Sequence, residues 1–193
     1  MCIRDRKLPG LPSGALNALS VAQVIAQLTP DNVIYAEEAA TSGFPLLMNL
    51  AQARPHTHLP LTRGSIGQGL PLAVRAALAA PGRKVICPHG DCGAAYTMQA
   101  LWTMARENLD VTTVIYANRS YAILNIELQR VGIGSVGAKA LSMFDLHNPE
   151  MNWTQIATGL GVEASRATTA EEFAAQYESA MKNKGPRLIE AMI

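Results

Sequence analysis

The stretch KVICPHGDCGAA, residues 84–95, decides the fold class of this chain. It begins with a short apolar, β-branched run and passes through small residues into an alanine-rich segment of helical length. The stretch VTTVIYANRSY, residues 111–121, repeats this passage one helix later. A continuous apolar run is typical of a strand that is buried on both faces. Strands that alternate with helices predict a parallel sheet with helices on both of its faces.

The same alternation extends to both ends of the chain. Further strands are predicted at 32–35 and 187–193, with weaker candidates at 58–61 and 161–164. Helices are predicted at about 17–28, 44–53, 67–79, 94–108, 121–130, 153–159 and 170–183. A capping box at Thr169-x-x-Glu172 marks the start of the last helix. We therefore predict an α/β fold, a single doubly wound domain of about six parallel strands over residues 8–193, after an unassigned tail at 1–7.

The composition narrows the function classes. The chain is 49% hydrophobic and 16% charged with a net charge of +1, so it can bury a sizeable core and offers no basic surface to a nucleic acid. No apolar run approaches the ~20 residues of a membrane span. The first residues lack the pattern of a signal peptide, and the three cysteines form no C-x-x-C pair. We expect a cytoplasmic protein with neither a membrane nor a nucleic acid as partner.

Polar residues follow two of the predicted strands at the point where each ends. Asp91 follows the strand predicted at 84–87. Asn118 lies 27 positions later and follows the strand predicted at 111–116. In a doubly wound sheet, ligands bind beyond the carboxyl ends of the strands, where helix N-termini favour a phosphate. A carboxylate beside an anion requires a cation, and Mg²⁺ takes few protein oxygens together with phosphate oxygens. The alternative is that both residues are simple helix caps.

These residues belong to a longer pattern that resembles a known family. Gly90-Asp91 followed by Asn118 is similar to the thiamin diphosphate motif, usually written GDG…NN. Together with Gly64–Pro71 (GSIGQGLP) and Tyr96–Glu107 (YTMQALWTMARE), it resembles the C-terminal, diphosphate-binding domain of acetolactate synthase large-subunit-like enzymes, relatives of benzoylformate decarboxylase. The resemblance covers roughly residues 8–193.

The resemblance implies roles for the matching positions. Asp91 and Asn118 would bind Mg²⁺ by their side chains, and Ser120 by its backbone carbonyl. The residues implied at the thiamin diphosphate are Thr41, Ile66, Gly90, Gly93, Ala94, Tyr121 and Ala122. Ile66 stands where the family places a bulky apolar residue that bends the cofactor, and the alternative for it is core packing.

The chain departs from the family pattern at one position of the motif. Cys92 replaces the third motif residue, a glycine. A Cβ at this position crowds the turn or forbids a positive φ, unless Gly93 absorbs the strain. On this argument, Cys92→Gly is expected to tighten cofactor binding by about 1–2 kcal/mol.

The implied function is that of a thiamin diphosphate-dependent transferase or lyase. Its substrate is a small 2-keto acid such as pyruvate, which is decarboxylated and joined to a second keto acid, as in branched-chain amino acid biosynthesis. The family's N-terminal pyrimidine-binding domain, which carries the activating glutamate, and its middle domain do not fit within 193 residues. We therefore expect no catalytic residue in this chain and no activity from it alone, and a homodimer or homotetramer for the full-length enzyme. FAD is possible but unsupported by this segment.

Other functional classes stay open at this point. A benzoylformate decarboxylase-like lyase or a non-catalytic, truncated cofactor-binding module would carry the same motif. An ordinary dinucleotide-binding domain is disfavoured because no G-x-G-x-x-G follows the first strand.

Two pairs of titratable residues and one thiol are assigned neither a catalytic nor a metal-binding role. His56 and His58 are interpreted as part of a polar loop before a strand, because no third metal ligand is placed nearby. Glu37 and Glu38 are interpreted as a solvated strand end rather than an acid/base pair. The thiol of Cys92 is interpreted as a chance substitution rather than a reactive group.

Two segments have mainly structural interpretations. Met98, Leu101, Trp102 and Ala105 recur at helical spacing, which favours a core face. Residues 131–150 are either a lid over the cofactor or a long connection.

Overall fold

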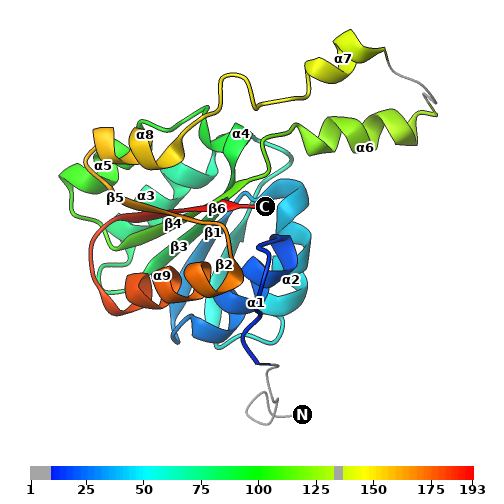
Figure 1. Ribbon diagram of the computed structural model, residues 1–193. Helices are drawn as coiled ribbons and strands as arrows, with labels where there is room; N and C mark the ends of the chain where they lie inside the picture. The colour runs from blue at the N-terminus through cyan, green and yellow to red at the C-terminus, as the bar shows by residue number, and fades with distance from the viewer. Residues whose placement is uncertain (1–9, 133–136) are drawn as a thin grey trace.

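The computed structural model describes residues 10–132 and 137–193. Its centre is a six-stranded sheet, and helices surround this sheet (Figure 1). The strands are β1 Val33–Glu37, β2 His56–Pro60, β3 Val85–Gly90, β4 Val111–Ala117, β5 Glu163–Ala167 and β6 Arg187–Met192. Their order is β2-β1-β3-β4-β6-β5, and every neighbouring pair is parallel. The predicted doubly wound α/β sheet is confirmed. The expected tail at residues 1–7 lies outside the described residues.

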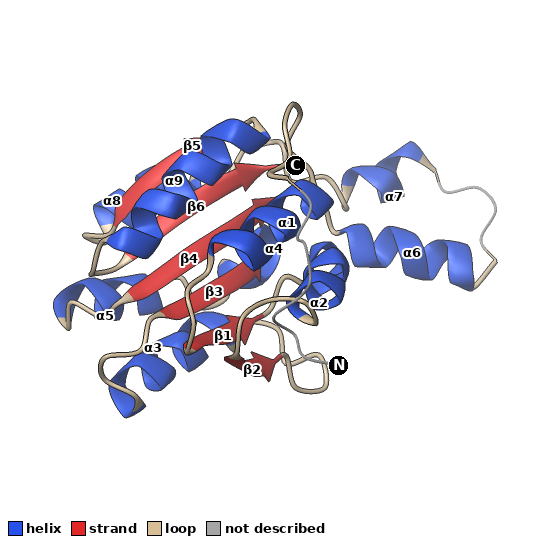
Figure 2. Cartoon of the chain, turned by 90° about the horizontal axis from the view of Figure 1, so that it is seen from below, coloured by secondary structure: helices blue, strands red, loops and turns tan. Residues whose placement is uncertain are grey.

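Helices cover both faces of the sheet, as Figure 2 shows from below. They are α1 Ala18–Leu28, η2 Ala40–Gly43, α2 Phe44–Leu50, α3 Gly69–Ala79, α4 Asp91–Ala94, α5 Ala100–Arg106, α6 Ala122–Arg130, α7 Ala138–Ser142, α8 Trp153–Gly159 and α9 Ala170–Lys182. One core lies between the sheet and α1, α2 and α9, and a second between the sheet and α3, α5 and α8. Successive side chains of β1 enter opposite cores, Ile34 one and Tyr35 the other.

Strands at the centre of the sheet are predicted more clearly from the sequence than strands at its edges. The continuous apolar strands β1 and β4 are buried along their whole length, because helices cover both of their faces. The weaker candidates correspond to β2 and β5, the two edge strands, which are only partly buried. His56 and His58 lie in β2, so their assignment to a loop before the strand is wrong.

The helix predicted at 94–108 is two helices, α4 and α5, separated by a turn at 95–99. A contact with the loop before α3 stabilises this turn: Thr97 Oγ1 donates a hydrogen bond to the carbonyl of Gly67 at 2.7 Å. The break also changes which side chains are buried. Leu101 is buried, but Met98 and Trp102 are exposed, so the predicted core face is wrong for those two.

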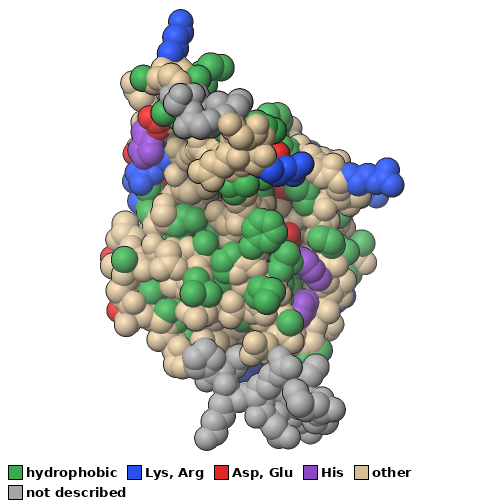
Figure 3. Space-filling view, turned by 90° about the vertical axis from the view of Figure 1, so that its right-hand side faces the viewer, with side chains coloured by type: hydrophobic (Ala, Val, Ile, Leu, Met, Phe, Trp, Pro, Cys, Tyr) green, Lys and Arg blue, Asp and Glu red, His purple; other side chains and the backbone are tan. Residues whose placement is uncertain are grey.

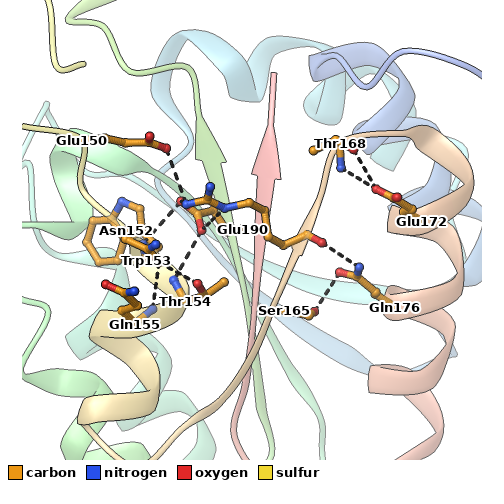
Figure 4. A network of polar contacts seen from close by, with 11 residues as sticks. Glu150, Asn152, Trp153, Thr154, Gln155, Ser165, Thr168, Glu172, Gln176 and Glu190 are labelled. Carbon is orange, nitrogen blue, oxygen red and sulfur yellow. Dashed lines mark hydrogen bonds and ion pairs between the residues drawn. The ribbon is translucent and has the colours of Figure 1, made fainter. Parts of the chain in front are cut away.

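Polar contacts fix the ends of the later helices. The capping box at Thr169 is confirmed: its hydroxyl accepts from the backbone N–H of Glu172, whose carboxylate accepts from the backbone N–H of Thr169. Glu190, fully buried in β6, ties α8 to the sheet (Figure 4). Its carboxylate accepts from the backbone N–H groups of Trp153 and Thr154, each at 3.4 Å, and pairs with Arg166 at 3.0 Å.

The segment after β4 extends away from the sheet. In Figure 1, α6 and α7 project from the carboxyl edge, and neither helix has a buried residue. Figure 3 views this side of the molecule and shows apolar side chains on its surface. Of the segment 131–150, residues 133–136 lie outside the described part of the chain. No helix within the described residues is long and apolar enough to cross a membrane.

Candidate functional site

Neighbouring strands bring Asp91 and Asn118 to one edge of the sheet. Gly90 of β3 is the register partner of Tyr116 of β4, so both strands end together. Asp91 opens α4 directly after β3, and its Oδ2 accepts a hydrogen bond from the backbone N–H of Arg119 at 2.8 Å. Asn118 Oδ1 accepts from the backbone N–H of Ser120 at 3.1 Å. The two strand ends are therefore joined by a direct contact.

The oxygens of this edge suit a hard cation. Asp91 is only 3% exposed, and its burial raises its pKa, although N–H donors from Arg119 and Cys92 oppose the shift. A nearby cation would favour its ionised form. One carboxylate, one amide oxygen and the Ser120 carbonyl are the kind of donors that Mg²⁺ accepts alongside phosphate oxygens. Within residues 10–132 and 137–193, no cluster of three or more His, Cys, Asp or Glu side chains could hold a metal.

Three residues with a strained backbone conformation lie at the same edge of the sheet. Ala40, Arg63 and Arg119 have φ values of 49°, 50° and 50°, and they follow β1, β2 and β4. Each costs roughly 1–2 kcal/mol in a residue that carries a Cβ. Such strain concentrates at ligand-binding sites, where the surrounding structure enforces it. Two further described residues with a positive φ, Asn32 and Asn108, precede β1 and β4 at the opposite edge, where asparagine adopts this conformation readily. The three strained positions are therefore consistent with a ligand site at the carboxyl edge.

A buried acid, Glu38, lies behind this edge. It is 3% exposed, and its Oε1 and Oε2 accept from the backbone N–H groups of Gly67 at 2.5 Å and Gly69 at 2.6 Å. The Nε2 atom of the fully buried His89 lies 3.2 Å from Oε2. Burial acts to raise the pKa of Glu38, but His89 and the two amides outweigh it, so that the pKa is lowered.

The interpretation of Glu37 and Glu38 as a solvated strand end is therefore wrong. Both are buried, and Glu37 Oε1 accepts from the backbone N–H of Ala39 at 2.7 Å. No local pattern signals this burial, because the amides that Glu38 binds lie 29 and 31 positions away in the chain.

Comparison with known proteins identifies the family. Residues 45–191 match the family described as "Thiamine pyrophosphate enzyme, C-terminal TPP binding domain". The chain belongs to this family. It is 50% identical over 186 residues to the "Putative acetolactate synthase large subunit IlvX" of Mycobacterium tuberculosis (strain ATCC 25618 / H37Rv), covering 96% of this chain and 36% of that protein.

Decarboxylases are also among the relatives of this thiamin diphosphate-binding domain. It is 32% identical over 177 residues to the benzoylformate decarboxylase of Pseudomonas aeruginosa, covering 92% of this chain and 32% of the relative. The solved thiamine diphosphate-dependent 4-hydroxybenzoylformate decarboxylase of Rhodococcus jostii RHA1 superposes with a TM-score of 0.80 at 26% identity, covering 97% of this chain and 34% of that one. The chain therefore spans about a third of the length of these relatives.

The residues implied at the cofactor occupy different parts of the edge. Ile66 is 54% exposed in the loop before α3, so core packing is wrong as its explanation. Thr41 is half-buried in η2, Ala94 is fully buried at the end of α4, and Tyr121 and Ala122 begin α6.

A Cβ added to Gly93 would lie 2.9 Å from Glu38 Oε1, whereas one added to Gly90 would make only ordinary contacts.

The structure also revises the argument about Cys92. It lies in α4, and neither Cys92 nor Gly93 has a positive φ, so the argument from a forbidden φ is wrong. Cys92 lines a shallow cleft of about 320 Å³, together with Tyr96, Tyr121, Leu146 and other residues. Its burial and the charge of Asp91 raise the pKa of the thiol, which opposes a role as a reactive thiolate.

Proposed function

We propose that this domain binds thiamin diphosphate through Mg²⁺ and serves an acetolactate synthase-like enzyme that acts on 2-keto acids. The observation that carries the proposal is the junction of the two strand ends, where Arg119 donates its N–H to Asp91 and Asn118 lies alongside. Membership of the family supports the cofactor, and the relatives support the reaction class.

Different residues at the carboxyl edge would bind the cation, the diphosphate and the rings of the cofactor. Asp91, Asn118 and the carbonyl of Ser120 would hold the cation. The backbone N–H groups of Gly93 and Ala94, and of Tyr121 and Ala122, would receive the diphosphate, with the hydroxyl of Thr41 nearby. Ile66 would offer an apolar surface to the rings. Thiamin diphosphate supplies the electron sink that allows a 2-keto acid to lose CO₂.

Cofactor titration of the 193-residue chain tests this proposal. We expect saturable binding of thiamin diphosphate, measured by calorimetry, that requires Mg²⁺. Asp91→Asn should weaken it at least 100-fold, because it removes the carboxylate from the cation site. Asp31→Asn is the matched control, an exposed carboxylate at the opposite end of β1. Asn118→Ala serves if Asp91→Asn does not fold. Unchanged affinity in Asp91→Asn, or binding without a divalent cation, would contradict the proposal.

We also infer that this chain alone does not turn over pyruvate. The resemblance assigns proton transfer at the cofactor to a glutamate of another domain, and the residues described here serve binding. The measurement is CO₂ release from pyruvate with thiamin diphosphate and Mg²⁺ present. A rate above that of the free cofactor would show that the chain carries catalytic groups of its own.

For the active enzyme we propose a homodimer or homotetramer. Exposed apolar side chains on two helices support this: Phe44, Leu47 and Met48 of α2, and Ile123, Leu124 and Ile126 of α6. Apolar surface of this kind is stabilised when it is covered by another protein surface. Equilibrium sedimentation of the catalytically active protein measures the assembly, and a monomer would contradict the proposal.

A further inference from the structure

The loop between β2 and α3 has few attachments to the rest of the molecule. Residues 62–66 are all exposed, and the backbone hydrogen bonds that they make are short turns within the loop, such as the one from the N–H of Ser65 to the carbonyl of Thr62. At the end of the loop, the N–H groups of Gly67 and Gly69 bind Glu38, and the carbonyl of Gly67 accepts from Thr97. Glu38 is therefore the main anchor of the loop that presents Ile66.

The same carboxylate faces the strand and turn that carry Asp91. His89 lies within 3.2 Å of it on β3, two residues before Asp91. A Cβ at Gly93 would lie 2.9 Å from Glu38 Oε1, and one at Gly69 would lie 2.9 Å from Glu38 Cβ and 2.8 Å from the His89 ring. Both glycines are required by this close packing, so the loop and the Asp91 turn both contact the side chain of Glu38.

A carboxylate is specifically suited to this position. Each of its oxygens accepts an N–H group, and such charge-assisted hydrogen bonds are stronger than neutral ones. A glutamine of the same shape would direct its NH₂ group at one of the two N–H donors. One amide would then lose its acceptor in a buried site, which is costly.

We propose that Glu38 is a positioning residue: by holding Gly67 and Gly69 it sets where Ile66 lies relative to Asp91, and so controls cofactor affinity without touching the cofactor. This inference rests on the proposed function for its last step only. Ile66 directly precedes Gly67, so release of the Gly67 amide frees the exposed apolar side chain from the fixed edge.

The experiment compares Glu38→Gln with Glu37→Gln, a neighbouring buried carboxylate that binds Ala39 instead. In the cofactor-free chain, NMR hydrogen exchange should be at least 10-fold faster at Gly67 and Gly69 in Glu38→Gln, with the amides of β4 unchanged. Thiamin diphosphate with Mg²⁺ should bind at least 10-fold more weakly. Glu37→Gln should leave both readouts within 2-fold. Glu38→Asp, which keeps the charge but shortens the reach, replaces Glu38→Gln if that variant does not fold.

A double-mutant cycle with Ile66→Ala separates positioning from general stability. If Glu38 acts through Ile66, Glu38→Gln should lower affinity less than 3-fold when Ile66 is already alanine. Unchanged exchange at Gly67 and Gly69, equally faster exchange at every amide, or full additivity in the cycle would each overturn the proposal. A wild-type chain that does not bind the cofactor would instead overturn the proposed function, and the exchange arm would still decide whether Glu38 holds the loop.

Discussion

Cys92 shows how one residue can look unfavourable in a motif and fit its backbone. The residue stands in place of a motif glycine, yet it lies in α4 with no positive φ. Glycine in a helix is less stable than a residue with a Cβ, because it loses more conformational freedom on folding. The local backbone therefore gives no reason for a glycine at this position.

We expect Cys92→Gly to lower the free energy of unfolding by about 0.5–1 kcal/mol, the usual cost of glycine within a helix. Urea denaturation followed by circular dichroism measures the change. Cys92→Ala is the control, since it removes the thiol and keeps the Cβ, and it should cost less. A glycine variant more stable than the wild type would show that the residue is strained after all.

Single buried acids link elements that lie far apart in the chain. Glu38 holds the loop before α3, and Glu190 holds the start of α8 through Trp153, Thr154 and Arg166 (Figure 4). A buried carboxylate is stable only when its oxygens are paired, so each acid fixes the relative position of the elements that it contacts.

Glu190→Gln is expected to destabilise the protein by about 2 kcal/mol, because a charged hydrogen-bond network within the core is lost. The figure is below that of a fully buried ion pair, since the side chain of Arg166 is 33% exposed and can be hydrated. Glu150→Gln is the matched control: Glu150 also approaches Arg166, at 3.5 Å, but is 39% exposed. Its loss should cost less than about 0.5 kcal/mol. Equal costs in urea denaturation would contradict this ranking.

The whole molecule is organised by the two cores on either side of the sheet. Tyr35, Tyr116 and Tyr177 are fully buried in the same core, and the hydroxyls of Tyr177 and Thr29 are 2.6 Å apart. Burial raises the pKa of each phenol above its ordinary value near 10. Their neutral form is therefore part of the stability of the fold.

The raised pKa values of these tyrosines predict that the stability of the protein falls at high pH. Because the folded pKa values are raised, the folded state holds protons that the unfolded state releases above about pH 10, so stability falls as the pH rises beyond that value. We expect these three phenols to ionise only as the fold is lost. Absorbance near 295 nm and far-ultraviolet circular dichroism, followed together, test this. Ionisation of the three phenols with the dichroism intact would contradict it.

The local pattern of the sequence determined the architecture of this domain. Apolar runs such as 111–116 and the helical segments between them already specified parallel strands covered on both faces, because burial on two sides requires continuous apolarity. The rule that ligands lie beyond strand ends then placed Asp91 and Asn118 at one edge, where the structure has them.

Only the tertiary structure decided which polar groups are buried and where local periodicity fails. The partners of Glu38 lie 29 and 31 positions away, and the helix expected at 94–108 breaks where Thr97 binds Gly67, 30 positions away. The exposure of Ile66 likewise depends on a loop held by distant groups. Periodicity records what neighbours in the chain prefer, whereas these features depend on contacts that exist only after the sheet has brought separate segments together.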